Sequence, residues 1–178
     1  DGAQHTIDAE VSLRGITRRR ICRFPPLKLH FDKKKLKGTE FRGNKSLKLV
    51  TYCEVNNKYE QYYIKEYLTY RIYNLITDYS VRARPMVNEY KDSGEDDSIT
   101  RFGFLIEDVD DVAKRNDLEE LSIPAVPFRQ LDPVTASRLS LFQYMIGNLD
   151  WAATSGPKDD KCCHNSKLIG AGNDVNPK

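Results

Sequence analysis

The chain has 178 residues and a mass of 20.5 kDa, enough for one domain with a hydrophobic core. Hydrophobic residues make up 39% of it, charged residues make up 30%, and the net charge is +2. We therefore expect a soluble, folded protein, and its bulk charge gives no case for a nucleic-acid partner. No apolar run approaches the length of a membrane-spanning helix, so we expect no membrane span. The sequence shows no secretory signal, but a chain that starts with Asp1 rather than Met fits a mature or excised product.

Alternating apolar and polar residues predict three strands at the start of the chain, over 7–13, 27–31 and 46–53. The first strand should have one buried face. The basic run 18–20 fits a solvated hairpin, and its functional alternative is contact with a phosphate or an acidic partner. Residues 32–45 are rich in Lys and Gly, so we expect them to form a long connection.

Lys48 lies on the third predicted strand, on the same face as Val50 and Tyr52. In one interpretation, its aliphatic stem lies along the sheet while its amine reaches water. In the other, it binds a phosphate inside a cleft. The strand pattern alone favours neither interpretation.

A long helix is predicted to run from Asn56 or Asn57, either of which can cap it, to Thr77. Glu60 stands in the capping-box position relative to Asn57. Two apolar stripes lie on nearly opposite sides of this helix, so we expect it to be packed on both sides. The aliphatic stripe is Ile64, Leu68, Ile72 and Leu75, and the aromatic stripe is Tyr59, Tyr63, Tyr70 and Tyr73.

Glu66 falls within the aromatic stripe, where its carboxylate needs a partner because an unpaired buried charge is costly. We rank Lys48 ahead of Arg71 and Lys65, since those two lie off the aromatic face. A tyrosine hydroxyl is the remaining alternative.

Two further strands are predicted over 81–91 and 100–106, with an acidic loop between them. Gly103, inside the second of these strands, should permit the close approach of another group. The four carboxylates within 107–111 fit the solvated start of a helix better than a cation site. A short polar helix should follow over 112–121.

The last predicted helix begins at Pro133, which suits the first helical position, with Asp132 as its cap. Gly147 fits the left-handed position that closes a helix. The residues at helical spacing that should form its buried face are Leu139, Phe142, Met145 and Ile146.

Asp150 should then stand on a loop just beyond a packed helix, which is a common way to present a catalytic base or a metal ligand. Asn165, at the far end of that loop, offers a neutral oxygen that a hard cation such as magnesium accepts. Both residue types are also ordinary turn formers. Taken together, strands, one helix, strands and then mostly helix predict an α+β fold with an antiparallel sheet in its first half.

A strand Lys, a helix Glu, two more strands, a linker, a helix, and then Asp and Asn on one loop follow the part order of a protein kinase fold. The segments that carry the likeness are Leu13-Arg14-Gly15 with basic residues after it, Pro26-Leu-Lys-Leu-His-Phe, Ser46-Leu-Lys-Leu-Val, the helix through Lys65-Glu66, Phe102-Gly-Phe-Leu-Ile-Glu-Asp, Gly147-Asn-Leu-Asp-Trp and His164-Asn. With these segments the sequence resembles the CotH-type (spore coat protein H) kinase-like family and its uncharacterised bacterial relatives.

The resemblance implies a protein-kinase-like fold. An N-lobe-like sheet with one buried helix would occupy residues 1–107, and a partial helical C-lobe with a catalytic-loop-like segment would occupy 108–178. It also implies a transferase that moves a phosphoryl group from ATP to a hydroxyl of a protein or small molecule, with Mg or Mn as the divalent metal.

By the same resemblance, Lys48 would hold the nucleotide phosphates, Glu66 would orient Lys48, and Glu107 would lie in the hinge beside the adenine. Asp150 would be the catalytic Asp, and Asn165 would be a magnesium ligand. The partners implied are a nucleotide and an unknown hydroxyl-bearing acceptor.

The family pattern continues with a second metal-binding Asp, in Asp-Phe-Gly or Asp-Phe-Asp. No such motif follows Asn165, and Asp174, the only later Asp, has different neighbours. We therefore expect a truncated chain, a C-terminal part that is not included in this sequence, or a degraded site.

Two alternatives to an enzyme stay open at this point. One is a non-catalytic kinase-like domain that binds a partner or nucleotide. The other is a secreted structural or surface-binding domain with Tyr62, Tyr67, Tyr79 and Tyr90 turned outward. The expected location is extracytoplasmic, either secreted or periplasmic.

The four cysteines are Cys22, Cys53, Cys162 and Cys163, and their spacing does not match a paired Cys-x-x-Cys metal site. Cys162 and Cys163 are adjacent, which is poor geometry for an ordinary disulfide between them. Either could pair with Cys22 or Cys53 in an oxidising compartment. Burial of Cys22 and Cys53 as free thiols is equally compatible with the sequence.

Overall fold

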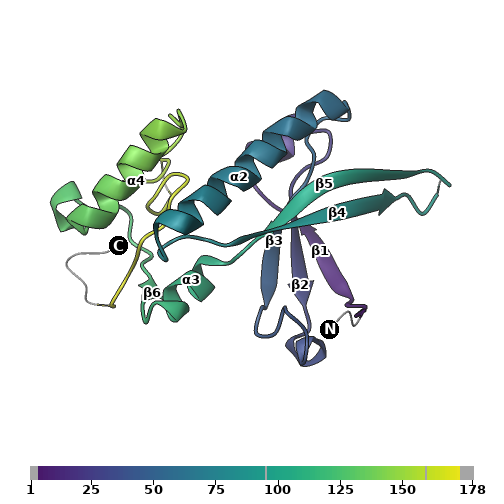
Figure 1. Ribbon diagram of the computed structural model, residues 1–178, viewed down its shortest axis with the longest axis horizontal. Helices are drawn as coiled ribbons and strands as arrows, with labels where there is room; N and C mark the ends of the chain where they lie inside the picture. The colour runs from purple at the N-terminus through teal and green to yellow at the C-terminus, as the bar shows by residue number, and fades with distance from the viewer. Residues whose placement is uncertain (1–3, 95, 159, 173–178) are drawn as a thin grey trace. The chain divides into compact units, whose positions relative to one another are not determined.

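The computed structural model describes residues 4–94, 96–158 and 160–172 (Figure 1). Its strands are β1 (Ala9–Leu13), β2 (Leu27–Phe31), β3 (Ser46–Val50), β4 (Ala83–Lys91), β5 (Ser98–Ile106), β6 (Glu119–Glu120) and β7 (Ile169–Gly170). Its helices are α1 (Arg18–Ile21), α2 (Glu60–Ile76), α3 (Val109–Arg115) and α4 (Pro133–Met145), with short 3-10 turns η1 (Lys33–Leu36), η2 (Asn57–Tyr59) and η3 (Phe128–Gln130). These elements form two compact units: the first is Asp1–Arg71 with Arg82–Asp108, and the second is Ile72–Val81 with Val109–Lys178.

The first unit is built on a five-stranded antiparallel sheet with the strand order β1-β2-β3-β5-β4 (Figure 1). The register places Leu27 opposite Leu49 and Leu49 opposite Leu105, so three leucines align across three neighbouring strands. The five strands lie close to where the alternation of residues predicts them. The α+β class, with an antiparallel sheet in the first half of the chain, is therefore confirmed.

The connection between β2 and β3 contributes to a hydrophobic layer on one face of this sheet. The buried side chains on this face are Leu47, Leu49 and Leu105. Phe41, from the connection, packs against them and stacks on Phe31 with ring centroids 6.0 Å apart. The segment predicted only as a long connection therefore completes a hydrophobic layer.

Aromatic side chains of α2 pack on the opposite face. Phe104 is completely buried, with its ring centroid 5.7 Å from that of Tyr67 and 5.9 Å from that of Tyr70. Lys48 lies on this face, because it stands opposite Ile106 while Val50 stands opposite Phe104. The predicted sharing of a face by Lys48 and Val50 is confirmed.

The expectation that α2 is packed on both sides is wrong for its aliphatic stripe. Ile64, Leu68, Ile72 and Leu75 keep between 39% and 88% of their surface exposed. The tyrosine side of the helix takes up the contact with the sheet, so the aliphatic side faces away from it.

The start of this helix also differs from the predicted capping box. Asn56 is the cap, and its side chain accepts a hydrogen bond from the backbone N–H of Lys58 in the η2 turn. The carboxylate of Glu60 instead accepts from the backbone N–H of Phe102, at 2.9 Å. Glu60 therefore binds the backbone of β5 instead of the N-terminus of its own helix.

Two other expectations near the N-terminus are wrong. Val11 and Leu13 of β1 are exposed rather than buried, because β1 is an edge strand with β2 as its neighbour in the sheet. The basic run 18–20 forms the helical turn α1 rather than a solvated hairpin.

Both expectations for the cysteines are wrong. Cys22 and Cys53 form a disulfide with each other, which ties the residue after α1 to the segment after β3. Adjacent Cys162 and Cys163 form the second disulfide, are joined by a cis peptide bond, and are both buried.

In the second unit, α3 packs against the strand β7. Val109, Val112 and Ala113 of the helix form a buried cluster with Ile169. The helix was predicted to continue to 121, but it ends at Arg115. Asp117 adopts a left-handed conformation, and the Leu118 N–H reaches the Ala113 carbonyl at 2.9 Å, which is the hydrogen bond of a Schellman cap.

The helix α4 begins and ends as predicted. The Asp132 side chain accepts from the Thr135 N–H at 2.8 Å, and Gly147 has a φ of 65°. Its buried face is only partly as predicted: Phe142 is buried, whereas Met145 and Ile146 are exposed. Thr135, Ala136 and Gln143 are buried instead.

Tyrosines that a surface-binding domain would turn outward mostly point inward. Tyr67 packs on Phe102 and Phe104, Tyr79 packs on the α3 cluster, and Tyr90 packs on the ring of Tyr52. Tyr62, in contrast, is 56% exposed.

Within the segments that the structure describes, no helix is both long enough and apolar enough to cross a membrane. Asp174, considered above for the second metal-binding position, lies outside the described residues.

Candidate functional site

Asp150 stands on a loop that α4 holds in place. Gln143 of α4 is buried; its carbonyl accepts from the Asn148 N–H at 2.9 Å, and its side-chain oxygen accepts from the Asn148 amide at 2.8 Å. The Asn148 side chain in turn accepts from the Asp150 N–H at 3.0 Å. A chain of hydrogen bonds therefore connects the buried face of the helix to the backbone of Asp150.

The segment that carries His164 and Asn165 is held in place by contacts of its own. Cys162 and Cys163 belong to a hydrophobic cluster of the second unit, together with Leu168 and residues near the start of α4. The Ala152 N–H donates to the carbonyl of His164 at 2.9 Å, and the His164 N–H donates to the carbonyl of Ser155 at 3.1 Å. This bridge brings residue 164 beside the start of the loop.

Three side chains meet as a result. His164 Nε2 lies 2.6 Å from Oδ1 of Asp150. The Asn165 amide donates to Oδ2 of Asp150 at 3.0 Å and to the Asp150 carbonyl at 2.7 Å. Both oxygens of the carboxylate are thus engaged, and the two residues predicted from the sequence lie within one hydrogen-bonded cluster. We call Asp150, His164 and Asn165 the loop cluster.

The electrostatics of the loop cluster keep Asp150 ionised. The hydrogen bond from His164 is the main reason that the pKa of this carboxyl lies below its ordinary value, and the Asn165 bond lowers it further. An ionised carboxylate can only accept, so Nε2 of His164 carries a proton and donates it in this hydrogen bond. The Asp150 side chain is 79% exposed, so it can meet a ligand from solvent.

Sequence reasoning did not assign a role to His164. Its position directly before Asn165 was the available signal that it lies near the site. Its contact with Asp150, however, depends on the pairing of Ala152 with His164. That isolated bridge has no periodic pattern from which it could be predicted.

The loop cluster provides few metal ligands. With its Nδ2 bound to Asp150, Asn165 has its Oδ1 on the other side of Cγ, within the same amide plane, where a hard cation could be bound. Across residues 4–94, 96–158 and 160–172, no group of three or more His, Cys, Asp or Glu side chains could hold a metal ion.

Lys48 belongs to the first unit, on the sheet face that α2 covers. It is half-buried and stands directly opposite Lys28 of β2 in the register. Because cross-strand partners share a face of the sheet, two cationic side chains lie on this face.

Glu66, also in the first unit, has an ion pair with a residue that the sequence analysis did not consider as its partner. Its Oε2 lies 3.0 Å from Nη2 of Arg18 in α1. The acidic group that the basic run 18–20 contacts is therefore a residue of the same chain. The predicted pair of Glu66 with Lys48 stays a prediction.

Arg14 and Tyr70 lie close to this ion pair. Burial lowers the pKa of the Arg14 guanidinium, and burial followed by the charge of Glu66 raises the pKa of Tyr70 to about 12. Nε of Arg14 is buried without a hydrogen-bond partner within the described part of the chain. Two arginines and one carboxylate give this region a positive excess.

Glu107 follows β5 directly, at the end of the first unit. Its carboxylate accepts from the backbone N–H of Arg82 at 2.9 Å, and its own N–H donates to the Arg82 carbonyl at 2.9 Å. Glu107 therefore fastens the end of β5 to the start of β4.

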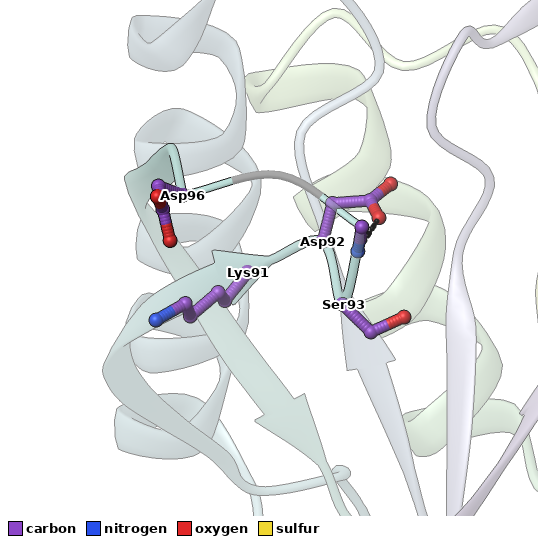
Figure 2. A pocket seen from close by; sticks show the side chains of 5 residues that line it. Lys91, Asp92, Ser93 and Asp96 are labelled. Atoms are coloured by element: carbon purple, nitrogen blue, oxygen red, sulfur yellow. Dashed lines mark hydrogen bonds between the residues drawn. The ribbon is translucent and has the colours of Figure 1, made fainter.

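A hollow at the tip of the β4–β5 hairpin contains none of these residues. Figure 2 shows its lining, which includes Lys91, Asp92, Ser93 and Asp96. Oδ1 of Asp92 accepts from the Gly94 N–H at 2.8 Å, which is the usual hydrogen bond of an Asx turn. The hollow is explained by hairpin geometry and does not indicate a ligand site.

No family model matches the sequence, and no match is found among curated proteins or among solved structures.

Proposed function

We propose that this protein is a kinase-like phosphotransferase that uses ATP and a divalent metal, Mg or Mn, to phosphorylate a hydroxyl of a protein or small molecule. The five-stranded sheet with α2 would be the N-lobe-like part, and the second unit would be a partial C-lobe. The main support is the loop cluster, where a carboxylate held on a rigid loop has an Asn beside it.

In the first unit, Lys48 would bind the nucleotide phosphates, with Lys28 beside it adding positive charge. Glu66 would orient Lys48 once released from Arg18, and Glu107 would lie beside the adenine. ATP would supply the transferable phosphoryl group, and the bound metal would neutralise the negative charge of the phosphates. Placing these side chains on strands and a packed helix keeps their positions fixed.

In the second unit, Asp150 would accept the hydrogen bond of the acceptor hydroxyl and take its proton as the transfer proceeds. A carboxyl with a lowered pKa is a weak base, so orienting the hydroxyl would be its larger contribution. His164 and Asn165 would fix the direction of the carboxylate, and Oδ1 of Asn165 would be a metal ligand.

The alternative is a non-catalytic kinase-like domain that binds a nucleotide or partner. It is favoured by the engagement of both oxygens of Asp150, and by the pairing of Glu66 with Arg18. A surface-binding role through tyrosines has less support, because Tyr67, Tyr79 and Tyr90 pack inward. An extracytoplasmic location is supported by the Cys22–Cys53 disulfide, since such bonds persist in oxidising compartments.

A thermal-shift titration with ATP, with and without Mg²⁺ or Mn²⁺, tests the nucleotide part of the proposal. A ligand that binds only the folded state stabilises it, by about 2.7 kcal/mol at a concentration one hundred times its Kd. We expect a metal-dependent rise in Tm that Lys48→Ala abolishes. Lys91→Ala, which removes an exposed lysine from β4, should retain it. The absence of any shift in the wild-type protein would overturn nucleotide binding.

Transfer is tested separately by release of ADP and by labelling of added hydroxyl acceptors. Asp150→Asn should retain the ATP-dependent rise in Tm and lose roughly 10²- to 10⁴-fold in rate. Asp110→Asn, which changes another exposed carboxylate of the second unit, should keep the wild-type rate. A metal-dependent shift without turnover in the wild type would favour the non-catalytic alternative.

A further inference from the structure

The connection between β2 and β3 carries a high density of positive charge. Residues 32–45 contain two carboxylates, Asp32 and Glu40, and six cationic side chains: Lys33, Lys34, Lys35, Lys37, Arg42 and Lys45. All six are exposed. We call residues 33–45 the basic connection; Figure 1 shows it extending beyond the ends of β2 and β3.

The backbone of the basic connection is fixed by hydrogen bonds and buried side chains. Leu36 is fully buried, and Phe41 packs into the layer beneath the sheet. Successive turns are closed by bonds such as that from the Arg42 N–H to the Thr39 carbonyl, at 3.2 Å. The bond from the Phe31 N–H to the Lys45 carbonyl, at 3.0 Å, joins its two ends. The cations are therefore presented by an ordered segment, so a ligand would not have to order the backbone.

Few of these charges are neutralised internally. Glu40 pairs with Arg84 of β4 rather than with a lysine of the connection. Lys35 pairs with Asp8 at 3.2 Å, but both side chains are largely exposed, so the pair is weak. In the part of the chain that the structure describes, the other five cations form no ion pair with a carboxylate. A dense group of unneutralised cations attracts an extended anion.

The chemistry of the connection limits which anion it suits. Its one aromatic residue, Phe41, is packed between Phe31 and the guanidinium of Arg84, so it cannot stack on a nucleobase. Its one large aliphatic residue, Leu36, is buried and cannot enter a lipid layer. Lysine ammonium groups act as point charges that suit repeated sulfate, carboxylate or phosphate groups.

The compartment favours one class of polymer. The Cys22–Cys53 disulfide lies in the same unit and is typical of a protein outside a reducing cytosol. Anionic polymers at cell surfaces are mainly polysaccharides. We propose that residues 33–45 form a binding surface for an anionic polysaccharide, a linear polymer with repeated sulfate, carboxylate or phosphate groups. Phe41 of this segment packs on the sheet face opposite to that of Lys48, and the proposed binding does not depend on phosphotransfer.

The test is binding of a fluorescent heparin oligosaccharide to the full chain over a range of NaCl concentrations. Lys33→Gln, Lys34→Gln and Lys37→Gln together should weaken binding about tenfold or more, and lower the slope of log K against log salt by roughly two to three. The matched control changes three exposed lysines elsewhere in the same unit, Lys58, Lys65 and Lys91, to Gln. It should leave that slope close to the wild-type value. Thermal unfolding of both variants shows whether each is folded.

Three outcomes would overturn the proposal. The first is no measurable heparin binding by the wild-type chain. The second is an equal loss in both triple variants, because binding would then follow net charge and not the basic connection. The third is tighter binding of double-stranded DNA, or of vesicles containing phosphatidylserine, than of heparin at the same ionic strength.

Discussion

Nε2 of His164 lies 2.6 Å from Oδ1 of Asp150, although fourteen positions separate the two residues in the chain. Asn165 donates to the other oxygen of the same carboxylate, so the direction of Asp150 is fixed from two sides. Hydrogen bonds to the ionised form favour that form, and His164 makes the larger contribution.

We therefore expect His164→Ala to raise the pKa of Asp150 toward its ordinary value. The lowered pKa contributes stability above the ordinary pKa of an Asp, and this stability is lost as the pH falls through the lower folded-state value. Loss of His164 should thus make folding stability less dependent on pH on the acidic side. Carbon-13 NMR titration of the carboxyl groups measures the pKa directly, and the carboxyl of Asp110 in the same spectra is the control. An unchanged Asp150 titration would show that the hydrogen bond does not form in solution.

Local sequence signals predicted the helix that supports this site, but they did not predict the contact between His164 and Asp150. Asp132, Pro133 and Gly147 define α4 through capping chemistry, which depends on neighbouring residues only. The meeting of His164 with Asp150 depends on a single bridge across a loop of irregular structure. Residue patterns carry no information on such a bridge.

The partner of Glu66 was missed for a similar reason. Arg18 reaches it from α1, a helical turn whose following residue, Cys22, is tied by a disulfide to Cys53. The cysteine pairing could not be deduced from the sequence, and so neither could the position of the turn. The aliphatic stripe of α2 shows a further limit, since a second apolar side on a helix does not require a covering element.

Double-mutant cycles should distinguish the two candidate partners of Glu66. Because the Arg18–Glu66 pair is partly exposed, we expect a coupling energy of about 0.2–1 kcal/mol between Arg18→Gln and Glu66→Gln. The corresponding cycle with Lys48→Gln measures the coupling that the kinase-like arrangement requires. Urea denaturation gives the four free energies of unfolding in each cycle. We expect the Arg18 coupling to be the larger one without nucleotide, and a larger Lys48 coupling would contradict the observed pairing.

The Cys22–Cys53 disulfide should stabilise the first unit substantially. The two cysteines are 31 positions apart, and closing a loop of that length in the unfolded chain corresponds to about 3–4 kcal/mol. Changing both cysteines to Ser should lower the free energy of unfolding by that amount, as measured by urea denaturation under oxidising conditions.

The second disulfide provides the comparison. Cys162 and Cys163 are adjacent, so their bond closes no long loop, and any cost of changing both to Ala reflects lost packing in the buried cluster. A loss well below 1 kcal/mol for the Cys22/Cys53 variant would show that this bond does not constrain the unfolded chain as expected.

Gly103 illustrates a sequence expectation that the structure confirms. A Cβ at this position of β5 would overlap Nδ2 of the buried Asn88 and the carbonyl oxygen of Val50. Neither can move easily, because the Asn88 side chain is buried and the Val50 carbonyl belongs to the backbone of β3. Gly103→Ala should therefore destabilise the protein by about 1–3 kcal/mol, the usual cost of overpacking. Gly94→Ala in the hairpin loop is the matched control, since its Cβ would lie 3.4 Å from Oδ1 of Asp92, which is ordinary contact. Equal urea midpoints for the two variants would mean that β4 and β3 relax around position 103 without cost.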